Sequence, residues 1–412
     1  MPPSPRKAQW SWALYDWANS AFATTVLAGF FPLFFNRYWA AGVAPETQTL
    51  YQGITATVAS LVVMLLAPWF GAIADRRGAR KRFLMAFTML GVVATASLYL
   101  VGQGQWGWAI ALSILGRIGF FGGQSFYDAL LVNVARPHEL DRVSSLGYGL
   151  GYLGGGLLFA VNVAMALKPD WFGLGDASLA TRVSFVMVAL WWLLFSLPLF
   201  RHVPEGEPVA SVSGWASLRS TLREIRGLRP VWMFLLAYWL YIDGVDTIIV
   251  MAVDFGMKLG FADDSLIVAL LMVQFIGFPA AIVFGRLGER YGTRAAIFLA
   301  LAIYSAVTLW AYFLETVAQF YLMAAAIGCV QGGIQALSRA FYARLIPPEK
   351  AGAFFGFYNM LGKFAAVLGP LVVGVTAQLT GNPRLAILSL LAFFLIGGWL
   401  LTRVPEPAST QR

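Results

Sequence analysis

The sequence predicts an all-α polytopic membrane protein with twelve transmembrane helices in two pseudo-symmetric six-helix bundles. Three observations predict this fold: an apolar composition, twelve apolar runs long enough to cross a bilayer, and a duplication between the two halves of the chain. Of the 412 residues, 59% are hydrophobic and 12% are charged, whereas a soluble protein carries about 25% charged residues. The single cysteine excludes an internal disulfide and a cysteine-rich metal site. We expect no metal and no cofactor.

Each apolar run matches the roughly 20 residues that an α-helix needs to span hydrocarbon. The first run is too long for a signal-peptide core, and no small-residue cleavage site follows it, so we expect a retained first span. The runs centre near residues 24, 62, 93, 118, 156, 189, 242, 274, 304, 328, 366 and 393.

The distribution of Lys and Arg predicts the orientation. One set of alternating loops, together with the termini, holds 21 of these 29 residues, and the opposite loops hold five. The other three, Arg117, Arg339 and Lys363, lie within spans. By the positive-inside rule both termini are cytoplasmic. We expect a monomer in the inner membrane of a bacterium, in contact with membrane lipids. The net charge of +9 then reflects topology, and we expect no nucleic-acid partner.

The longest polar interruption divides the chain into three parts. We predict an N-terminal bundle over residues 1–200, a cytoplasmic linker over 201–229 and a C-terminal bundle over 230–412. The second half of the linker, Trp215 to Leu228, has the pattern of a short basic amphipathic helix on the inner leaflet.

The two halves resemble each other. GAIADRRGAR begins at Gly71 and GRLGERYGTR begins 214 residues later at Gly285, and the fourth spans repeat at an offset of 210. Duplication with a central loop is the plan of a transporter built from two parallel repeats. The predicted gating loops contain Gly71, Asp75, Arg76, Gly78 and Arg80 in the first half and Glu289 and Arg290 in the second.

The residue types in these loops suit a latch. Glycines allow a tight turn and close helix approach, and an acidic residue can cap a neighbouring helix or hold an arginine across the bundle. The latch would form on one side of the protein and break when the halves rock. The alternative is a positive-inside loop that does no more than turn the chain.

This pattern resembles the signature loop of the major facilitator superfamily over the whole chain. Three stretches resemble, more narrowly, the "unknown major facilitator" family, which includes the vacuolar amino-acid effluxers linked to autophagy. The resemblance implies alternating-access transport of amino acids, outward from the compartment that the protein faces. The stretches are LYDWANSAF at 14–22, GRIGFFGGQSFYDALL at 116–131 and ALSRAFYARLIPPEKAGAFFGFYNMLGKFAAVLGP at 336–370.

The chain departs from the superfamily pattern at two points. GLGYLGGG at 149–156 has the glycines of the antiporter motif of span five and lacks its proline, and the spacing around Arg117 is altered. Proton exchange therefore does not follow from the resemblance.

Span four carries a polar stripe formed by Arg117, Gln124 and Asp128. At 100° per residue the three fall within about 40° of one another. Arg117 and Asp128 lie about 16 Å apart along the axis, so they cannot pair with each other. A charge in a span costs about 2.5–3.5 kcal/mol, so each needs a partner. The stripe either lines a substrate pathway or holds other helices in place.

Two further spans carry acidic residues. Asp16 and Asn19 lie on a small polar face of span one, where Asp16 either lines a pathway or favours the helix N-terminus. Asp243 and Asp246 in span seven form a candidate proton-coupling pair, because neighbouring carboxylates can hold a proton between them.

Spans ten and eleven complete the candidate site. Gln335 belongs to a polar stripe on span ten, while Arg339 lies near the cytoplasmic end, where it could snorkel to the interface. On span eleven, Asn359 and Lys363 are i, i+4 neighbours, and Lys363 either binds a carboxylate substrate or pairs with Asp128 or Asp16.

Together these residues predict a secondary transporter of a small amphoteric solute, such as an amino acid, with possible proton coupling. Arg117 and Lys363 would neutralise a carboxylate, and Asp16 or Asp128 would hold an ammonium group. The alternatives are a lipid or lysolipid flippase on the same fold and a non-transporting membrane receptor or scaffold. We expect no enzyme, because no nucleophile–base pair, Walker A pattern or HExxH pattern is present.

Overall fold

The protein is described by a computed structural model over residues 5–208 and 215–405, and within these residues twelve helices are long and apolar enough to cross a membrane. Each predicted centre falls inside one of them, which confirms the predicted all-α membrane fold. The spans are Pro5–Trp39, Pro45–Arg77, Arg80–Leu100, Trp106–Val134, Leu140–Leu167, Ala177–His202, Arg229–Ala252, Ser265–Tyr291, Thr293–Ala311, Val317–Leu345, Pro348–Thr380 and Arg384–Thr402.

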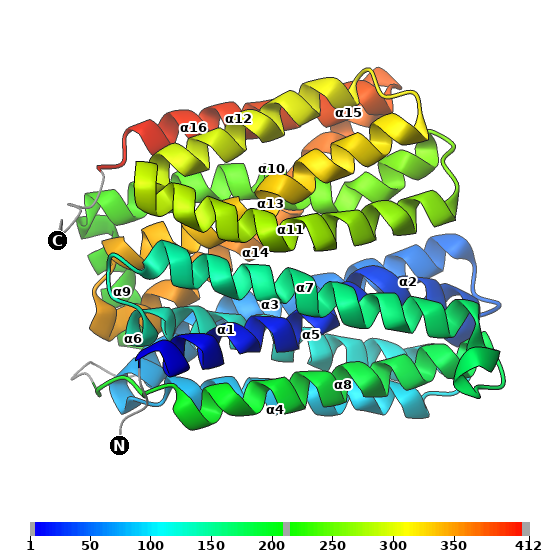
Figure 1. The fold of residues 1–412 in the computed structure, drawn as a ribbon, viewed down its shortest axis with the longest axis horizontal. Coiled ribbons are helices and arrows are strands. Elements are labelled where there is room, and N and C mark those ends of the chain that lie inside the picture. Colours follow the sequence, from blue (N-terminus) through cyan, green and yellow to red (C-terminus); the bar gives the residue numbers. More distant parts are fainter. Residues whose placement is uncertain (1–4, 209–214, 406–412) are drawn as a thin grey trace.

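The first six spans fill the lower half of Figure 1 and the last six the upper half. A wider π-helical segment, Phe22–Phe30, joins α1 to α2 within the first span. The first half contains α1 (Pro5–Ala21), α2 (Phe31–Phe34), α3 (Pro45–Arg77), α4 (Arg80–Ser97), α5 (Trp106–Ala129), α6 (Leu131–Val134), α7 (Leu140–Leu167) and α8 (Ala177–His202). The second half contains α10 (Arg229–Lys258), α11 (Asp263–Tyr291), α12 (Thr293–Ala311), α13 (Val317–Leu345), α14 (Ala351–Thr380), α15 (Pro383–Leu388) and α16 (Leu390–Thr402), with α9 (Trp215–Gly227) between the halves.

Four helices make most of the contact between the halves: α7 packs on α11, and α3 packs on α14. Small residues allow this close approach. A Cβ atom on Gly71 of α3 would collide with the carbonyl group of Gly352 at the start of α14. Gly78 ends α3 with φ +56°, a left-handed conformation that glycine adopts without strain. The two glycines thus place the end of α3 directly against the second half.

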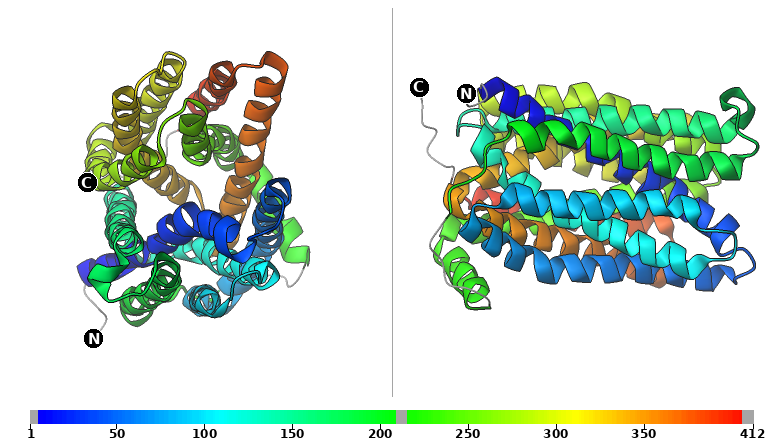
Figure 2. Two further views of the ribbon diagram at one scale, coloured as in Figure 1. Left: turned by 90° about the vertical axis from the view of Figure 1, so that its right-hand side faces the viewer. Right: turned by 90° about the horizontal axis from the view of Figure 1, so that it is seen from below.

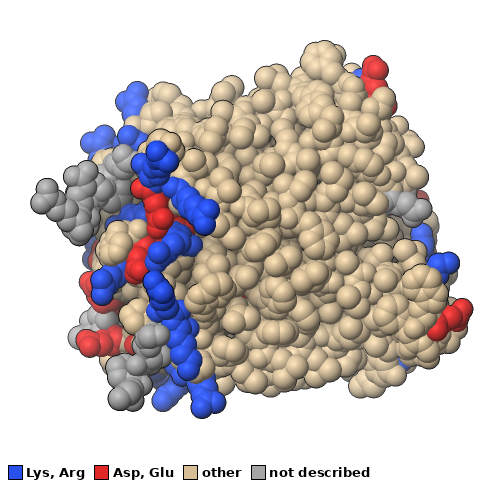
Figure 3. Space-filling model, viewed as in Figure 1, with Lys and Arg blue, Asp and Glu red and all other residues tan. Residues whose placement is uncertain are grey.

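Charged residues gather at the ends of the molecule. Figure 3 shows a dense band of Lys and Arg at the end of the molecule where α1 begins and α16 ends, and a surface almost free of charge over the middle. We call this the basic end. Figure 2 shows α9 at the basic end, running across the direction of the spanning helices. Its exposed face carries Arg219, Arg223 and Arg226, while Ile225 packs inward.

Candidate functional site

A buried ionic group lies between the two halves around Arg339 of α13, which has no exposed surface. Its Nη1 atom lies 3.0 Å from Oδ1 of Asp128 on α5, and its Nη2 atom lies 3.5 Å from Oδ2 of Asp16 on α1. The guanidinium also donates to Ser144 of α7, to the hydroxyl at 2.9 Å and to the carbonyl at 2.9 Å. We call Asp16, Tyr127, Asp128, Ser144 and Arg339 the Arg339 cluster.

Aromatic rings enclose this guanidinium. Its central carbon lies 4.8 Å from the ring centre of Trp12, 5.3 Å from that of Tyr127 and 4.4 Å from that of Tyr148. A guanidinium is attracted to the faces of such rings. The expectation that Arg339 snorkels to the interface is therefore wrong: the side chain points into the protein, where two carboxylates compensate its charge.

The two carboxylates of the cluster differ in how well they are satisfied. Asp128 accepts three side-chain hydrogen bonds, from Arg339 at 3.0 Å, Gln124 at 3.1 Å and Asn359 at 2.9 Å. For Asp16, the described side chains provide one, from the Tyr127 hydroxyl at 2.8 Å. Its 3.5 Å separation from Arg339 exceeds the roughly 2.7–2.9 Å of a charge-assisted hydrogen bond. Asp16 is thus the less compensated acid.

A second charged group joins α5, α10 and α14. The Nζ atom of Lys363 lies 3.3 Å from the ring centre of Phe121 and interacts electrostatically with Asp246 and Arg117. Unlike Arg339, the side chains of Arg117, Asp246 and Lys363 keep part of their surface exposed. We call Arg117, Phe121, Asp246 and Lys363 the Lys363 cluster.

Arg117 differs from Arg339 in how its charge is compensated. Its only hydrogen bond to the described residues is from Nε to the Ser113 hydroxyl at 3.3 Å, and none of their carboxylates lies within 4.0 Å of it. Asp128 has a partner on another helix, Arg339, as predicted for each charge of the stripe, whereas no described carboxylate pairs with Arg117.

Asp243 and Asp246 have different partners. Asp243 is fully buried, and its Oδ1 atom accepts hydrogen bonds from the Gly369 backbone at 2.8 Å and from Thr247 at 3.4 Å. Its Oδ2 atom finds no partner among the described residues. Asp246 instead acts on Lys363. The two carboxylates act on each other electrostatically but have separate partners, and their role as a proton-coupling pair stays a prediction.

The other predicted polar residues lie near these groups. Asn19 is buried one turn beyond Asp16 on α1. The Oε1 atom of Gln335 accepts a hydrogen bond from the Tyr152 hydroxyl at 3.1 Å and so links α13 to α7.

At the basic end, the loop after α3 holds the start of α14. The Oδ1 atom of Asp75 accepts from Arg80 at 2.7 Å and from the Gly352 backbone at 2.9 Å, and its Oδ2 atom accepts from the Ala353 backbone at 2.8 Å. Arg80 also donates to the carbonyls of Pro348 and Glu349. A carboxylate at a helix N-terminus is favoured by the free backbone donors there. Asp75 and Arg80 with this helix start are the first latch.

A second latch joins the same two halves with different residues. Asp141 of α7 accepts from Arg344 of α13 at 2.8 Å and from the Thr293 hydroxyl at 2.7 Å. Glu289 and Arg290, the predicted counterparts of the first latch, are exposed, and so is Arg76. The repeat predicts that the acid of the second latch is Glu289, in the second half of the chain. The acid that bridges the halves there is instead Asp141, in the first half.

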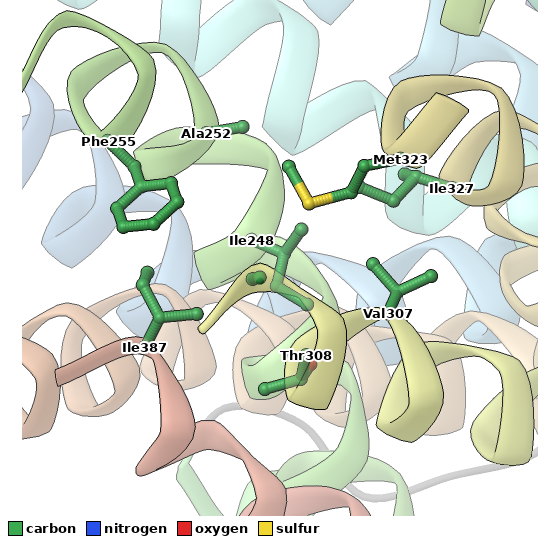
Figure 4. Close-up of a pocket in the computed structure, with 9 residues that line it drawn as sticks. Ile248, Ala252, Phe255, Val307, Thr308, Met323, Ile327 and Ile387 are labelled. Carbon is green, nitrogen blue, oxygen red and sulfur yellow. The ribbon is translucent and has the colours of Figure 1, made fainter. Parts of the chain in front are cut away.

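A small pocket lies elsewhere, among α10, α12, α13 and α15 (Figure 4). It has room for little more than one water molecule. No charged side chain lines it, so it is separate from both clusters. Its lining residues are Ile248, Ala252, Phe255, Val307, Thr308, Ala311, Met323, Ile327 and Ile387.

Solved structures with a similar fold are membrane transporters. The human organic anion transporter MFSD10 matches with a TM-score of 0.75 and 17% identity, over 97% of this chain and all of that chain. The major facilitator transporter FucP in the outward conformation matches with a TM-score of 0.71 and 13% identity, over 98% of each chain. At these identities the likeness shows the fold, which is the one that major facilitator transporters share.

The chain belongs to the family described as "Vacuole effluxer Atg22 like", whose model matches residues 4–412. It is 39% identical to the Bacillus subtilis (strain 168) protein described as "Uncharacterized MFS-type transporter YxiO", over 98% of this chain and 96% of that protein. Autophagy-related protein 22 of Yarrowia lipolytica is 26% identical over 66% of this chain, which spans about half the length of that relative. These relatives confirm the predicted resemblance and a transporter rather than an enzyme.

Proposed function

We propose that this transporter exports a small amphoteric solute, an amino acid, by alternating access between its two bundles, residues 1–200 and 230–412. The observation that carries the proposal is Arg117, a cation without a carboxylate partner among the described residues, which acts electrostatically on Lys363, the partner of Asp246. Burying an unpaired charge is costly, so the arrangement is best explained by a ligand that supplies the missing anion.

An α-amino acid fits this group of charges. Its carboxylate would lie between Arg117 and Lys363, and its ammonium group would lie against Asp246. The sequence suggested Asp16 or Asp128 for the ammonium group, but both acids already surround Arg339. Lys363 is the electrostatic partner of Asp246. When Lys363 turns toward the substrate carboxylate, the substrate ammonium group takes the place of Lys363 beside Asp246.

The cycle requires the basic end to open. In this structure that end is closed by both latches and by the Arg339 cluster. The excess of Lys and Arg there supports placing it in the cytoplasm of a bacterial cell, with the monomer as the working unit. Outward transport is supported by the description of the family as effluxers.

Counterflow in proteoliposomes with a panel of amino acids tests the proposal. We expect Arg117→Gln to abolish exchange while the purified protein stays folded, because the substrate carboxylate loses its partner. The matched control is Arg37→Gln, since Arg37 is an exposed arginine of the same bundle. If wild type exchanges no amino acid, or Arg117→Gln exchanges normally, the proposal fails. Competition by lysolipids in place of amino acids would favour a lipid flippase.

A further inference from the structure

We infer that the outer side of α9 binds the anionic headgroups of the membrane, and that this binding holds the basic end closed. This side of the helix consists of Arg219, Leu222, Arg223 and Arg226, and we call it the arginine face. The inference rests on the proposed alternating access, because it concerns the opening of the basic end. It gives the lipid surface a regulatory role that is separate from the solute site.

The arginine face follows from the helical spacing of α9. At 100° per residue its three arginines fall within about 60° of one another. Leu222 lies beside them and is 37% exposed. Thr221 and Ile225 lie on the other side of the helix and are buried. The helix α9 therefore has one side that packs on the bundles and one basic side that stays exposed.

No acid compensates the arginine face among the residues that the structure describes. None of its three arginines has a described carboxylate within 4.0 Å. Glu224, the one acid in the sequence of α9, is paired with Lys350 at 2.8 Å. Like charges three and four positions apart destabilise a helix, and a helix of 13 residues is marginal alone in water. Phosphate groups at this face would remove the repulsion and so stabilise α9.

The position of α9 favours a lipid surface over a soluble anion. The helix runs across the direction of the spanning helices at the basic end (Figure 2), so it lies along the surface that the headgroups occupy. A basic amphipathic helix in this position binds anionic lipids, and an apolar side chain such as Leu222 can insert between them. The three arginines are spread over about 10 Å of helix, which suits several headgroups better than one small ion.

The helix is also connected to the first latch. The Nζ atom of Lys350 lies 2.8 Å from Oε2 of Glu224, and α9 packs on α3, α10 and α14. Shortly after Lys350, the backbone N–H groups of Gly352 and Ala353 donate to Asp75 of α3. When the basic end opens, α3 and α14 part, so α9 must release at least one of them. Headgroups that stabilise the docked helix therefore favour the closed state.

Hydrogen exchange of the full chain in lipid nanodiscs tests the inference. Nanodiscs of phosphatidylcholine alone are compared with nanodiscs that also contain phosphatidylglycerol, and no solute is added. The backbone N–H groups of α9 report the folded helix, and those of Gly352 and Ala353 report the first latch. We expect both sets to exchange at least about tenfold more slowly with the anionic lipid, because each arginine near an anionic surface adds to the attraction.

A triple substitution of the arginine face should remove this response. With Arg219→Gln, Arg223→Gln and Arg226→Gln combined, α9 and the first latch should exchange at the same rate in both nanodiscs. The matched control lowers the net charge by the same amount at three other exposed arginines of the basic end, and it should respond as wild type does. Its substitutions are Arg136→Gln, Arg286→Gln and Arg290→Gln.

Four results would overturn the inference. They are equal exchange of wild type in both nanodiscs, an unchanged response in the arginine-face variant, loss of the response in the control, and slowing in α9 without slowing at Gly352 and Ala353. The same slowing by inorganic phosphate in phosphatidylcholine nanodiscs would also contradict it and assign the face to a soluble anion. Because no amino acid is present, failure of the counterflow assay does not affect these results.

Discussion

The two charged groups between the bundles differ in how their charges are compensated. In the Arg339 cluster, one fully buried cation meets two acids, a serine and three aromatic rings. In the Lys363 cluster, Asp246 acts on Lys363, and no described carboxylate pairs with Arg117, although both cations are partly exposed. A compensated buried charge holds a conformation, whereas an uncompensated one at an accessible position suits a ligand. The comparison separates a conformational lock from the proposed substrate site.

Removing Arg339 has the largest expected effect on stability. Arg339→Gln leaves Asp16 and Asp128 buried without their cation, and breaking a buried ion pair in this way costs about 3–5 kcal/mol. We expect a strong fall in the thermal unfolding temperature of the protein in detergent. Asp16→Asn and Asp128→Asn added to Arg339→Gln should recover part of the loss, because the unpaired charges are gone. A single variant as stable as wild type would show that the cluster does not lock the fold.

Removing one donor to Asp128 should have a smaller effect. Asn359→Ala deletes the hydrogen bond of 2.9 Å from α14 while Arg339 and Gln124 remain. A hydrogen bond to a charged group contributes about 1.5–3 kcal/mol, so we expect a moderate fall in the unfolding temperature. Asn36→Ala, at an exposed position of the first span, is the control and should stay near wild type, because water can replace the hydrogen bond that the Asn36 side chain accepts from Gln52. Equal effects of the two substitutions would contradict the importance of the Asp128 network.

The sequence predicted the twelve spans because the bilayer imposes one length and one polarity on every helix. It also predicted the stripe of Arg117, Gln124 and Asp128, because three residues on one helix obey helical spacing. It did not predict that Arg339 meets Asp128. Arg339 lies six residues before the end of α13, which is about 9 Å along the helix axis. At that depth a long side chain can reach the membrane interface or point into the protein. One feature of the sequence could have indicated this pairing. The offset of 210 between the halves aligns Arg339 with Ala129, beside Asp128, so the two charges occupy neighbouring positions in the repeat.

Pairing between helices was harder to predict than spacing within them. The repeat indicated that the loop around Glu289 would copy the loop around Asp75, yet the second latch uses Asp141 and Arg344. Both residues lie on the basic end, where many charges are available and the partner depends on how α7 and α13 pack. Likewise, i, i+3 spacing put Asp243 and Asp246 close together along α10. Only the positions of Gly369 and Lys363 on α14 show that the two acids serve different neighbours.

The smallest stability effect should come from the residue with the largest expected effect on exchange. Arg117→Gln removes a cation that no described carboxylate compensates, so the fold loses little more than the 3.3 Å contact with Ser113. Removing an unpaired charge from a span also relieves its desolvation cost. We therefore expect an unfolding temperature equal to or above that of wild type, measured in the same detergent as Arg339→Gln. A fall as large as that of Arg339→Gln would mean that Arg117 is a structural residue, and the contrast between the two clusters would disappear.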